Sequence, residues 1–132
     1  MSEVIGIGTD LCGIARIAKA IEKDSFVSRV YTETERGILE ACGAGRAQTA
    51  AAFFAAKEAV AKALGTGFAS GVAMRDISVS HDGAGAPQVT LSGGALRRMQ
   101  ALGGSRVLLS LTHEDGMAAA FAVLTGEPKL KE

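Results

Sequence analysis

Lys57, Glu58 and Lys62 are the side chains whose types and spacing best suit catalysis or ligand binding. In a helix, Glu58 and Lys62 share one face because they are four residues apart. Lys57 would lie about 100° around the axis from Glu58. A carboxylate beside two ammonium groups suits a metal ion together with an anionic substrate such as a phosphate ester. The alternative is an ordinary solvated Glu–Lys pair, which stabilises a helix by only about 0.3–0.5 kcal/mol.

The segment that carries these charges, 46–64, predicts a long helix because it is rich in alanine and contains no proline. Small side chains recur every four positions and leave one face smooth enough for another element to approach closely. These residues are Ala51, Ala55, Ala59 and Ala63. The helix is expected to stop at Gly65-Thr66-Gly67, because glycine tolerates the positive φ that ends a helix.

A second carboxylate, Asp10, follows the β-branched run 3–8, which predicts a strand. At the carboxyl end of that strand Asp10 would be placed to meet a ligand. As the N-cap of the next helix it would be structural, and its two oxygens allow both roles. Asp10 and Glu58 together would suit magnesium, which prefers octahedral oxygen ligands. Lys62, one turn beyond Glu58, would then reach an adjacent phosphate as a point charge.

An amphipathic helix is expected at 11–23, where Arg16 and Lys19 form a small basic edge. Such an edge is either solvated or docks an acidic partner. Thr32 and Glu35 have the spacing of a capping box at the start of a further helix, which favours a structural role for Glu35.

Of the remaining segments, 26–31 is expected to be a link, 76–80 with 88–91 a hairpin, and 95–102 a short helix. Two strands are expected at 107–112 and 117–124, followed by polar residues at 125–132. This order predicts an α+β fold, with a mostly antiparallel sheet packed on the long central helix. The 132 residues are expected to form a single domain, 1–125, followed by a polar C-terminal tail, 126–132.

Charge and composition exclude several classes of protein. The 14 basic and 14 acidic side chains argue against sequence-independent nucleic-acid binding, which needs a basic excess. No apolar run approaches the roughly 20 residues that span a bilayer. The N-terminus carries Glu3 and lacks the basic region of a secretory signal. Cys12 and Cys42 lack Cys-x-x-Cys spacing, which favours a reducing compartment, the cytoplasm.

Two histidines have weaker claims to a function. His113 is expected in a polar turn after a strand, and His81 in the hairpin turn. An isolated histidine in such a place is more often structural or solvated than catalytic.

Four blocks of residues together resemble the holo-acyl-carrier-protein synthase family, the small type of 4′-phosphopantetheinyl transferase. They are 5–11 (IGIGTDL) with Arg16-Ile17; 54–67 (FAAKEAVAKALGTG); Asp76-Ile77 with Asp82, Gly85, Pro87, Val89 and Leu91; and 109–114 (LSLTHE). Tyr31-Thr32 with Glu35 fits a weaker block. The resemblance spans nearly the whole chain and implies the phosphopantetheinyl transferase fold.

The resemblance also implies an activity. The family transfers the 4′-phosphopantetheine group of coenzyme A to a serine of apo acyl carrier protein and releases adenosine 3′,5′-bisphosphate. It implies that Asp10 and Glu58 hold Mg²⁺ against the pyrophosphate and that Lys62 contacts the same phosphate region. It further implies a homotrimer with active sites between subunits.

Other site residues carry over in the same way. His113 and the Gly65-Thr66-Gly67 turn match positions that line the coenzyme A site, and Pro87, with Gly85, matches the segment near the adenine end. Arg16 matches a residue of the first helix that meets the acidic carrier protein.

The chemistry of these residue types agrees with this activity. Phosphoryl-type transfer depends mainly on positioning and charge neutralisation. A magnesium ion would withdraw charge from the attacked phosphorus, and Lys62 would stabilise the developing charge. The serine must lose a proton, and Glu58 is the candidate base, either directly or through a metal-bound water. The water route is favoured, because a carboxylate that ligates a metal is a poor base.

One residue departs from the family pattern. Phe53 stands where members usually carry arginine, just before the Phe-Ala-Ala-Lys-Glu run. This departure points to an unusual carrier, of the polyketide type or another specialised kind, as an alternative to the fatty-acid carrier.

Two other hypotheses compete with the transferase. One is a non-catalytic relative that binds coenzyme A or a carrier protein as a structural subunit, and Asp10, Glu58 and Lys62 argue against it because a retired site is free to lose its metal ligands. The other is a structural α+β domain with solvated charges. Metal-dependent coenzyme A binding separates these hypotheses, since the structural domain would show none and the non-catalytic relative would bind without turnover.

Overall fold

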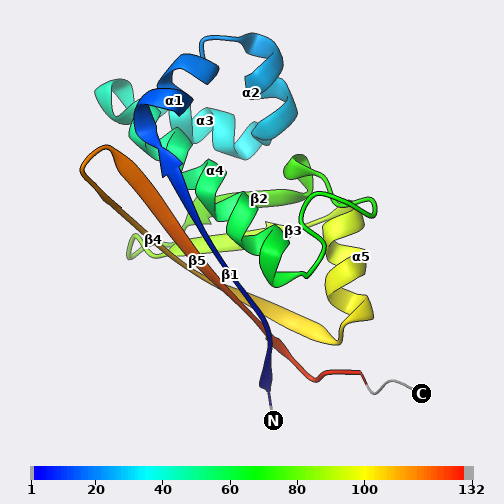
Figure 1. Ribbon diagram of the computed structural model, residues 1–132. Coiled ribbons are helices and arrows are strands. Elements are labelled where there is room, and N and C mark those ends of the chain that lie inside the picture. Colours follow the sequence, from blue (N-terminus) through cyan, green and yellow to red (C-terminus); the bar gives the residue numbers. More distant parts are fainter. Residues whose placement is uncertain (1, 130–132) are drawn as a thin grey trace.

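The chain folds around one long helix that packs on a three-stranded sheet, as seen in the computed structural model, which describes residues 2–129 (Figure 1). In chain order its elements are β1 (Glu3–Gly13), α1 (Ile14–Ala20), α2 (Asp24–Val30), α3 (Glu33–Ala41), η1 (Gly43–Gly45), α4 (Arg46–Ala63), η2 (Met74–Asp76), β2 (Ile77–His81), β3 (Pro87–Leu91), α5 (Gly93–Ala101), β4 (Gly104–Glu114) and β5 (Met117–Gly126). The expected α+β class, with antiparallel strands packed on a long central helix, is confirmed.

The main sheet has the strand order β1-β5-β4, and both pairings are antiparallel. Asp10 of β1 lies opposite Ala120 of β5, which in turn lies opposite Leu111 of β4. Side chains alternate along a strand, so each strand presents one set of residues to α4 and the other set to the opposite face. A second, two-stranded sheet is the β2–β3 hairpin, which confirms the hairpin expected near 76–91.

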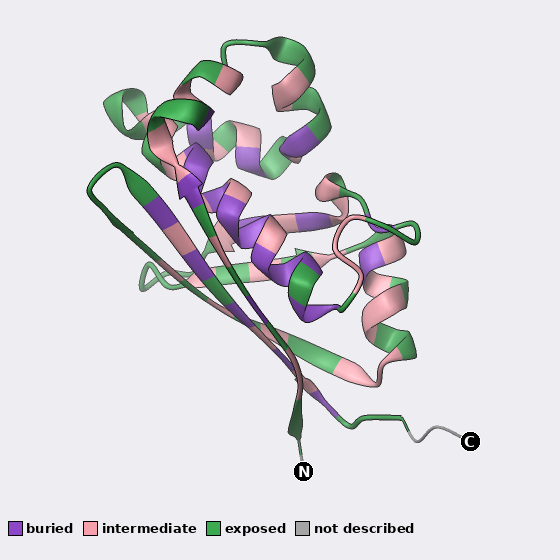
Figure 2. Cartoon of the chain, viewed as in Figure 1, coloured by how far each residue is buried: buried purple, intermediate pink, exposed green. Residues whose placement is uncertain are grey.

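The alanine face of α4 is the surface that β1 crosses. Its four alanines are almost completely shielded from solvent, and Figure 2 shows buried residues concentrated along this helix. They are Ala51, Ala55, Ala59 and Ala63. A Cβ added at Gly6 would collide with the backbone oxygen of Ala63, and one at Gly8 with that of Ala59. The smooth helix face therefore meets an equally smooth strand, as the alanine spacing predicts.

The first strand is longer than the sequence indicates, which changes the position of Asp10. β1 continues to Gly13, because pairing with β5 extends to the Gly13–Met117 pair. Asp10 therefore lies inside the strand, and both expectations for it, a strand end and a helix N-cap, are wrong. The N-cap of α1 is Gly13.

Other boundaries also differ from the expectations. The expected link 26–31 is mostly helix α2, and the expected helix 11–23 is reduced to α1. His113 lies within β4, and His81 is the last residue of β2. β5 includes Thr125 and Gly126, so the tail begins later, and its last residues, 130–132, lie outside the described residues. No helix in residues 2–129 combines the length and apolar character needed to cross a membrane.

We expect Gly8→Ala to lower the free energy of unfolding by about 1–3 kcal/mol, because its Cβ would push β1 away from α4. Gly37→Ala is the matched control. Gly37 lies within α3 with open space around it, so alanine there should stabilise the protein by about 0.5–1 kcal/mol. Urea denaturation measures both values. Equal effects of the two substitutions would contradict the close approach of β1 to α4.

Candidate active site

Asp10 and Lys62 meet where β1 crosses the C-terminal half of α4. Lys62 Nζ lies 3.2 Å from Asp10 Oδ1 and donates a hydrogen bond to the backbone oxygen of Thr9 at 3.0 Å. The side chain of Lys62 is 51% exposed and that of Asp10 is 19% exposed, so the ion pair is accessible from solvent. The structure therefore brings together a lysine and a carboxylate that are 52 residues apart in the chain.

Glu58 belongs to the same group of charges. Burial raises the pKa of the Glu58 carboxyl, and the neighbouring Asp10 carboxylate raises it further. Lys62 and Arg16 act in the opposite direction, since their positive charges favour the ionised form. Two carboxylates from different elements thus share one site, together with two cations.

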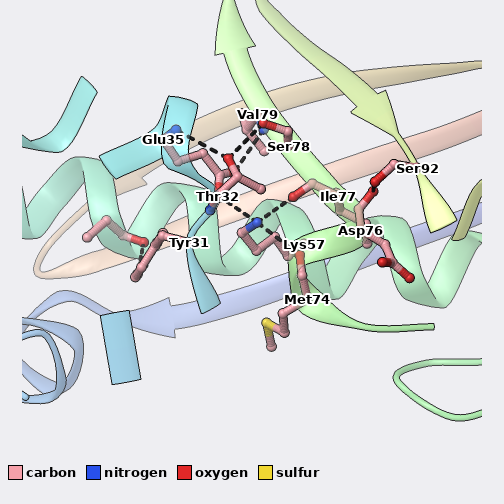
Figure 3. Close-up of polar contacts among 11 residues, drawn as sticks. Tyr31, Thr32, Glu35, Lys57, Met74, Asp76, Ile77, Ser78, Val79 and Ser92 are labelled. Carbon is pink, nitrogen blue, oxygen red and sulfur yellow. Dashed lines mark hydrogen bonds and ion pairs between the residues drawn. The ribbon is translucent and has the colours of Figure 1, made fainter. Parts of the chain in front are cut away.

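Lys57 takes no part in this group, in contrast to the expectation of two ammonium groups beside Glu58. Its side chain is fully buried, and its Nζ lies 2.7 Å from Glu35 Oε1 (Figure 3). Nζ also donates to the backbone oxygen of Met74 at 3.1 Å and to that of Ile77. Burial lowers the pKa of Lys57, while Glu35 opposes this shift. Lys57 therefore ties α4 to α3 and β2 and is not available to a ligand.

Glu35 has more partners than a capping role requires. The capping box is present, with Glu35 Oε1 accepting from the Thr32 amide at 2.8 Å and the Thr32 hydroxyl accepting from the Glu35 amide at 3.2 Å. Glu35 Oε2 also accepts from the Val79 amide of β2 at 2.7 Å, and the side chain is fully buried. The structural role favoured by the sequence is confirmed, and the ion pair with Lys57 is an addition that the sequence did not reveal.

His113 lies far from Lys62 within one chain, and β5 separates it from β1, which carries Asp10. Its Nε2 is 3.1 Å from the Gln48 side-chain nitrogen, near the start of α4. Gln48 and Lys62 are separated by roughly 20 Å along the helix axis. His113 also borders a cavity of about 180 Å³ together with Phe53 and His81.

Pro87 and the Gly65-Thr66-Gly67 turn line two further, separate cavities. Pro87 borders a cavity of about 590 Å³ between β3, α5 and β4. Gly65 and Thr66 border another of about 590 Å³, on the α5 side of the turn. Gly65 and Gly67 have φ of 80° and 58°, which is the backbone conformation expected for a turn that ends a helix. One chain therefore does not bring all the expected coenzyme A residues into a single pocket.

A basic surface lies beside the Asp10–Glu58 group. The cavity of about 470 Å³ on α1 and α2 is lined by four cations, Arg16, Lys19, Lys23 and Arg29, with Phe26 among them. The guanidinium of Arg16 lies over the ring of Phe54, 5.7 Å from its centroid, and Arg29 lies over Phe26 at 5.9 Å. The sequence indicated Arg16 and Lys19 only. Arg29 was missed because 26–31 was interpreted as a link and not as a helix, and Lys23 was placed on the expected helix 11–23 without being counted in its basic edge.

Phe53, the departure from the family pattern, is fully buried. Its ring centroid lies 6.0 Å from that of His81. It therefore contributes to the core and presents no charge to a ligand.

Comparisons with known proteins identify the family. A family model described as the 4′-phosphopantetheinyl transferase superfamily matches residues 6–122. The chain belongs to this superfamily. A holo-[acyl-carrier-protein] synthase from Shewanella amazonensis is 48% identical, with 92% of this chain and 98% of the relative covered. The family resemblance and the enzyme class predicted from the sequence, a phosphopantetheinyl transferase, are therefore confirmed.

Solved structures of this family share the fold. The holo-[acyl-carrier-protein] synthase from Neisseria meningitidis matches with a TM-score of 0.83 at 35% identity, covering 92% of this chain and 98% of that one. The Bacillus anthracis str. Ames synthase, solved in complex with CoA (3′,5′-ADP), matches with a TM-score of 0.79 at 34% identity, covering 94% and 98%. The phosphopantetheinyl transferase fold predicted from the sequence is thus confirmed.

The donor set at Asp10 and Glu58 fits a magnesium ion. No group of three or more His, Cys, Asp or Glu side chains suited to a metal occurs within residues 2–129, so these two carboxylates would be the protein's share. Magnesium is commonly held by one or two carboxylates, with water and substrate phosphates as the other ligands. A divalent cation would also offset the repulsion that contributes to the raised pKa of Glu58.

We expect Glu58→Gln to make the protein more stable than the wild type at neutral pH when a chelator removes divalent cations. The folded-state pKa of Glu58 is raised, so the folded protein holds this proton to a higher pH than the unfolded chain. Ionisation of Glu58 therefore costs stability as the pH rises from the ordinary glutamate pKa through the folded-state pKa. Below the ordinary pKa the variant and the wild type should be equally stable.

Urea denaturation across this pH range measures the difference. Glu40→Gln, at an exposed carboxylate of α3, is the control for the change to an amide. The same pH dependence of stability in wild type and Glu58→Gln would contradict the raised pKa.

Proposed function

We propose that this transferase moves the 4′-phosphopantetheine group from coenzyme A to a serine of apo acyl carrier protein, with Mg²⁺ as cofactor. The observation that carries the proposal is the group formed by Asp10, Glu58 and Lys62 in a chain of this superfamily. The name of the Shewanella relative and the CoA complex of the Bacillus synthase support the choice of donor and acceptor.

The reaction requires one bond to form and one to break. The serine oxygen attacks the phosphorus attached to pantetheine, and the bond from that phosphorus to the bridging oxygen of the pyrophosphate breaks. Adenosine 3′,5′-bisphosphate leaves with the electron pair of that bond. Bound Mg²⁺ would neutralise charge on the two phosphates. The protein must orient the phosphates, stabilise the leaving group and accept the serine proton.

Each residue of the group has a role in this scheme. Asp10 and Glu58 would hold the metal. Lys62, half exposed and held by Asp10 and the Thr9 carbonyl, would contact a phosphate oxygen. Glu58 is the candidate base, directly or through a metal-bound water, and the water route is favoured because a carboxylate that ligates a metal is a poor base.

The basic surface on α1 and α2 is proposed to dock the acidic carrier. Its lining residues include four cations. The neighbouring carboxylates Glu22 and Asp24 are not among them. Arg16 belongs both to this surface and to the charges that act on Glu58. A carrier bound here would therefore place its serine beside the metal site. A specialised carrier stays the alternative to the fatty-acid carrier, because Phe53 supplies no charge.

The active site is proposed to be completed by a second subunit of a homotrimer. The sheet face opposite α4 is covered by no helix of the described residues (Figure 1). Large apolar side chains are exposed on this face of β1, β4 and β5, and they are Val4, Ile7, Leu11, Leu108, Met117 and Phe121. Association through this face would bury them. A second subunit bound there is proposed to supply the coenzyme A residues, such as His113 and Pro87, that one chain does not bring to Asp10.

The proposed compartment is the cytoplasm. Cys12 and Cys42 carry free thiols, and Cys12 is buried, which suits a reducing environment. In that compartment the enzyme would have access to coenzyme A and to the carrier.

Incubation of the protein with coenzyme A, Mg²⁺ and apo acyl carrier protein should add one phosphopantetheine group to the carrier, as read by intact mass. EDTA should abolish the gain, because without a divalent cation the Asp10 and Glu58 carboxylates would repel the negatively charged pyrophosphate. Glu58→Gln should slow transfer by about 10²–10⁴-fold, while Glu40→Gln should leave the rate unchanged. A full rate with Glu58→Gln, or in EDTA, would contradict the proposed metal site. No gain with any carrier in a panel of fatty-acid and polyketide types would contradict the transferase.

Arg16→Glu should raise the apparent KM for the carrier about tenfold and change the KM for coenzyme A much less, because it places a carboxylate in the basic surface. Arg75→Glu makes the same change of charge at an exposed position of η2 outside this surface. An equal carrier KM for the two variants would exclude α1 and α2 as the docking surface.

A further inference from the structure

Two arginines of α5 face the turn that follows α4. Arg97 and Arg98 border the cavity of about 590 Å³ that the loop 65–71 lines from the other side, and Gly94 closes it at the start of α5. Figure 1 shows this loop beside α5.

Arg98 is held in place by the end of α4. Its Nε donates a hydrogen bond to the backbone oxygen of Leu64 at 2.9 Å. Its Nη2 lies 3.4 Å from where a Cβ on Gly65 would be, so the guanidinium lies along the turn. The bond at Nε leaves the guanidinium the donors of its two terminal nitrogens, which suit an anion.

The backbone around the cavity is also closely fitted. A Cβ on Gly94 would collide with the backbone oxygen of Gly71, so α5 and the loop are in direct contact. Gly65 N donates to Lys62 O at 2.9 Å and Gly67 N to Ala61 O at 3.1 Å, which fixes the turn on the helix end. The arginines therefore face a loop of defined shape.

The cavity is positively charged. Its lining includes no carboxylate, and neither arginine pairs with one among residues 2–129. Asp76, near the start of α5, is already engaged, since its Oδ2 accepts from the amides of Ala73 at 3.0 Å and Ala95 at 3.3 Å. Two guanidinium groups that form no ion pair among residues 2–129 favour a phosphate, which arginine binds through paired hydrogen bonds.

We infer that Arg97 and Arg98, with the Gly65-Thr66 turn, bind a phosphate group of coenzyme A. The inference rests on the proposed function, and it adds α5 to the donor site. The turn is continuous with α4, which carries Lys62, so the cavity and Lys62 belong to the same end of this helix. Arg97 and Arg98 would thus position the donor without touching the bond that breaks.

The test is calorimetric titration of coenzyme A and, separately, of inorganic phosphate into wild type, Arg97→Gln and Arg75→Gln, all with Mg²⁺ and at low salt. Arg97 is exposed, so its replacement should not affect folding. We expect Arg97→Gln to weaken coenzyme A binding about tenfold and to raise the KM for coenzyme A with little change in kcat. Arg75→Gln should match the wild type.

Arg98→Lys is the second variant, because it keeps the charge and loses the bond to Leu64. It should weaken coenzyme A binding while circular dichroism shows an intact fold. Three results would overturn the inference: unchanged coenzyme A affinity in Arg97→Gln, weaker binding of inorganic phosphate alone, or a higher KM for the carrier alone. The last two would assign the cavity to free phosphate or to the acidic carrier. Failure of the wild type to bind coenzyme A would instead reject the proposed function, before any variant is compared.

Discussion

The buried ion pair between Glu35 and Lys57 is the interaction on which the arrangement of the other elements depends. Both side chains are fully shielded, and their remaining polar atoms bond to backbone groups of η2, β2 and the start of α3. Removing one partner of such a pair typically costs about 3–5 kcal/mol, because the other charge stays buried without compensation. The pair therefore holds α3, α4 and β2 in one relative position and fixes the rotation of α4 about its axis.

That rotation determines which residues reach the active site. Lys57 and Glu58 are adjacent in the chain, so with Lys57 held towards β2, Glu58 turns towards β1 and Asp10. The alanines then face β1, where Gly6 and Gly8 leave no space for a Cβ. A single helix thus separates a structural side, which contains a satisfied buried pair, from a functional side, which contains accessible charges and a carboxyl with a raised pKa.

The sequence predicted what local spacing determines. The extent of α4, its alanine face, the Thr32–Glu35 capping box and the β2–β3 hairpin follow from residues close together in the chain, and the structure contains all of them. The length of β1 depends on pairing with β5, more than 100 residues later, and local propensity could not reveal it. The sequence suggested that Lys57 and Glu58 act together because they are adjacent in the chain. Adjacent residues of a helix can nevertheless face different surroundings, and here Lys57 is buried while Glu58 lies beside Asp10. Arg29 of α2 was missed with its helix, and the contact between Arg98 and the end of α4 is visible only in three dimensions.

The contact of Gly6 and Gly8 with α4 limits how this chain can change over evolution. An enlarged side chain in a core is often tolerated when a neighbouring side chain becomes smaller. Here the atoms that a new Cβ would meet are main-chain atoms of Ala59 and Ala63, which every amino acid possesses. No substitution on α4 can make room for a larger residue at these positions, and a suppressor of such a change would have to shift the whole helix or strand. Glycine at these two sites is therefore a requirement of the backbone path, independent of the side chains around it.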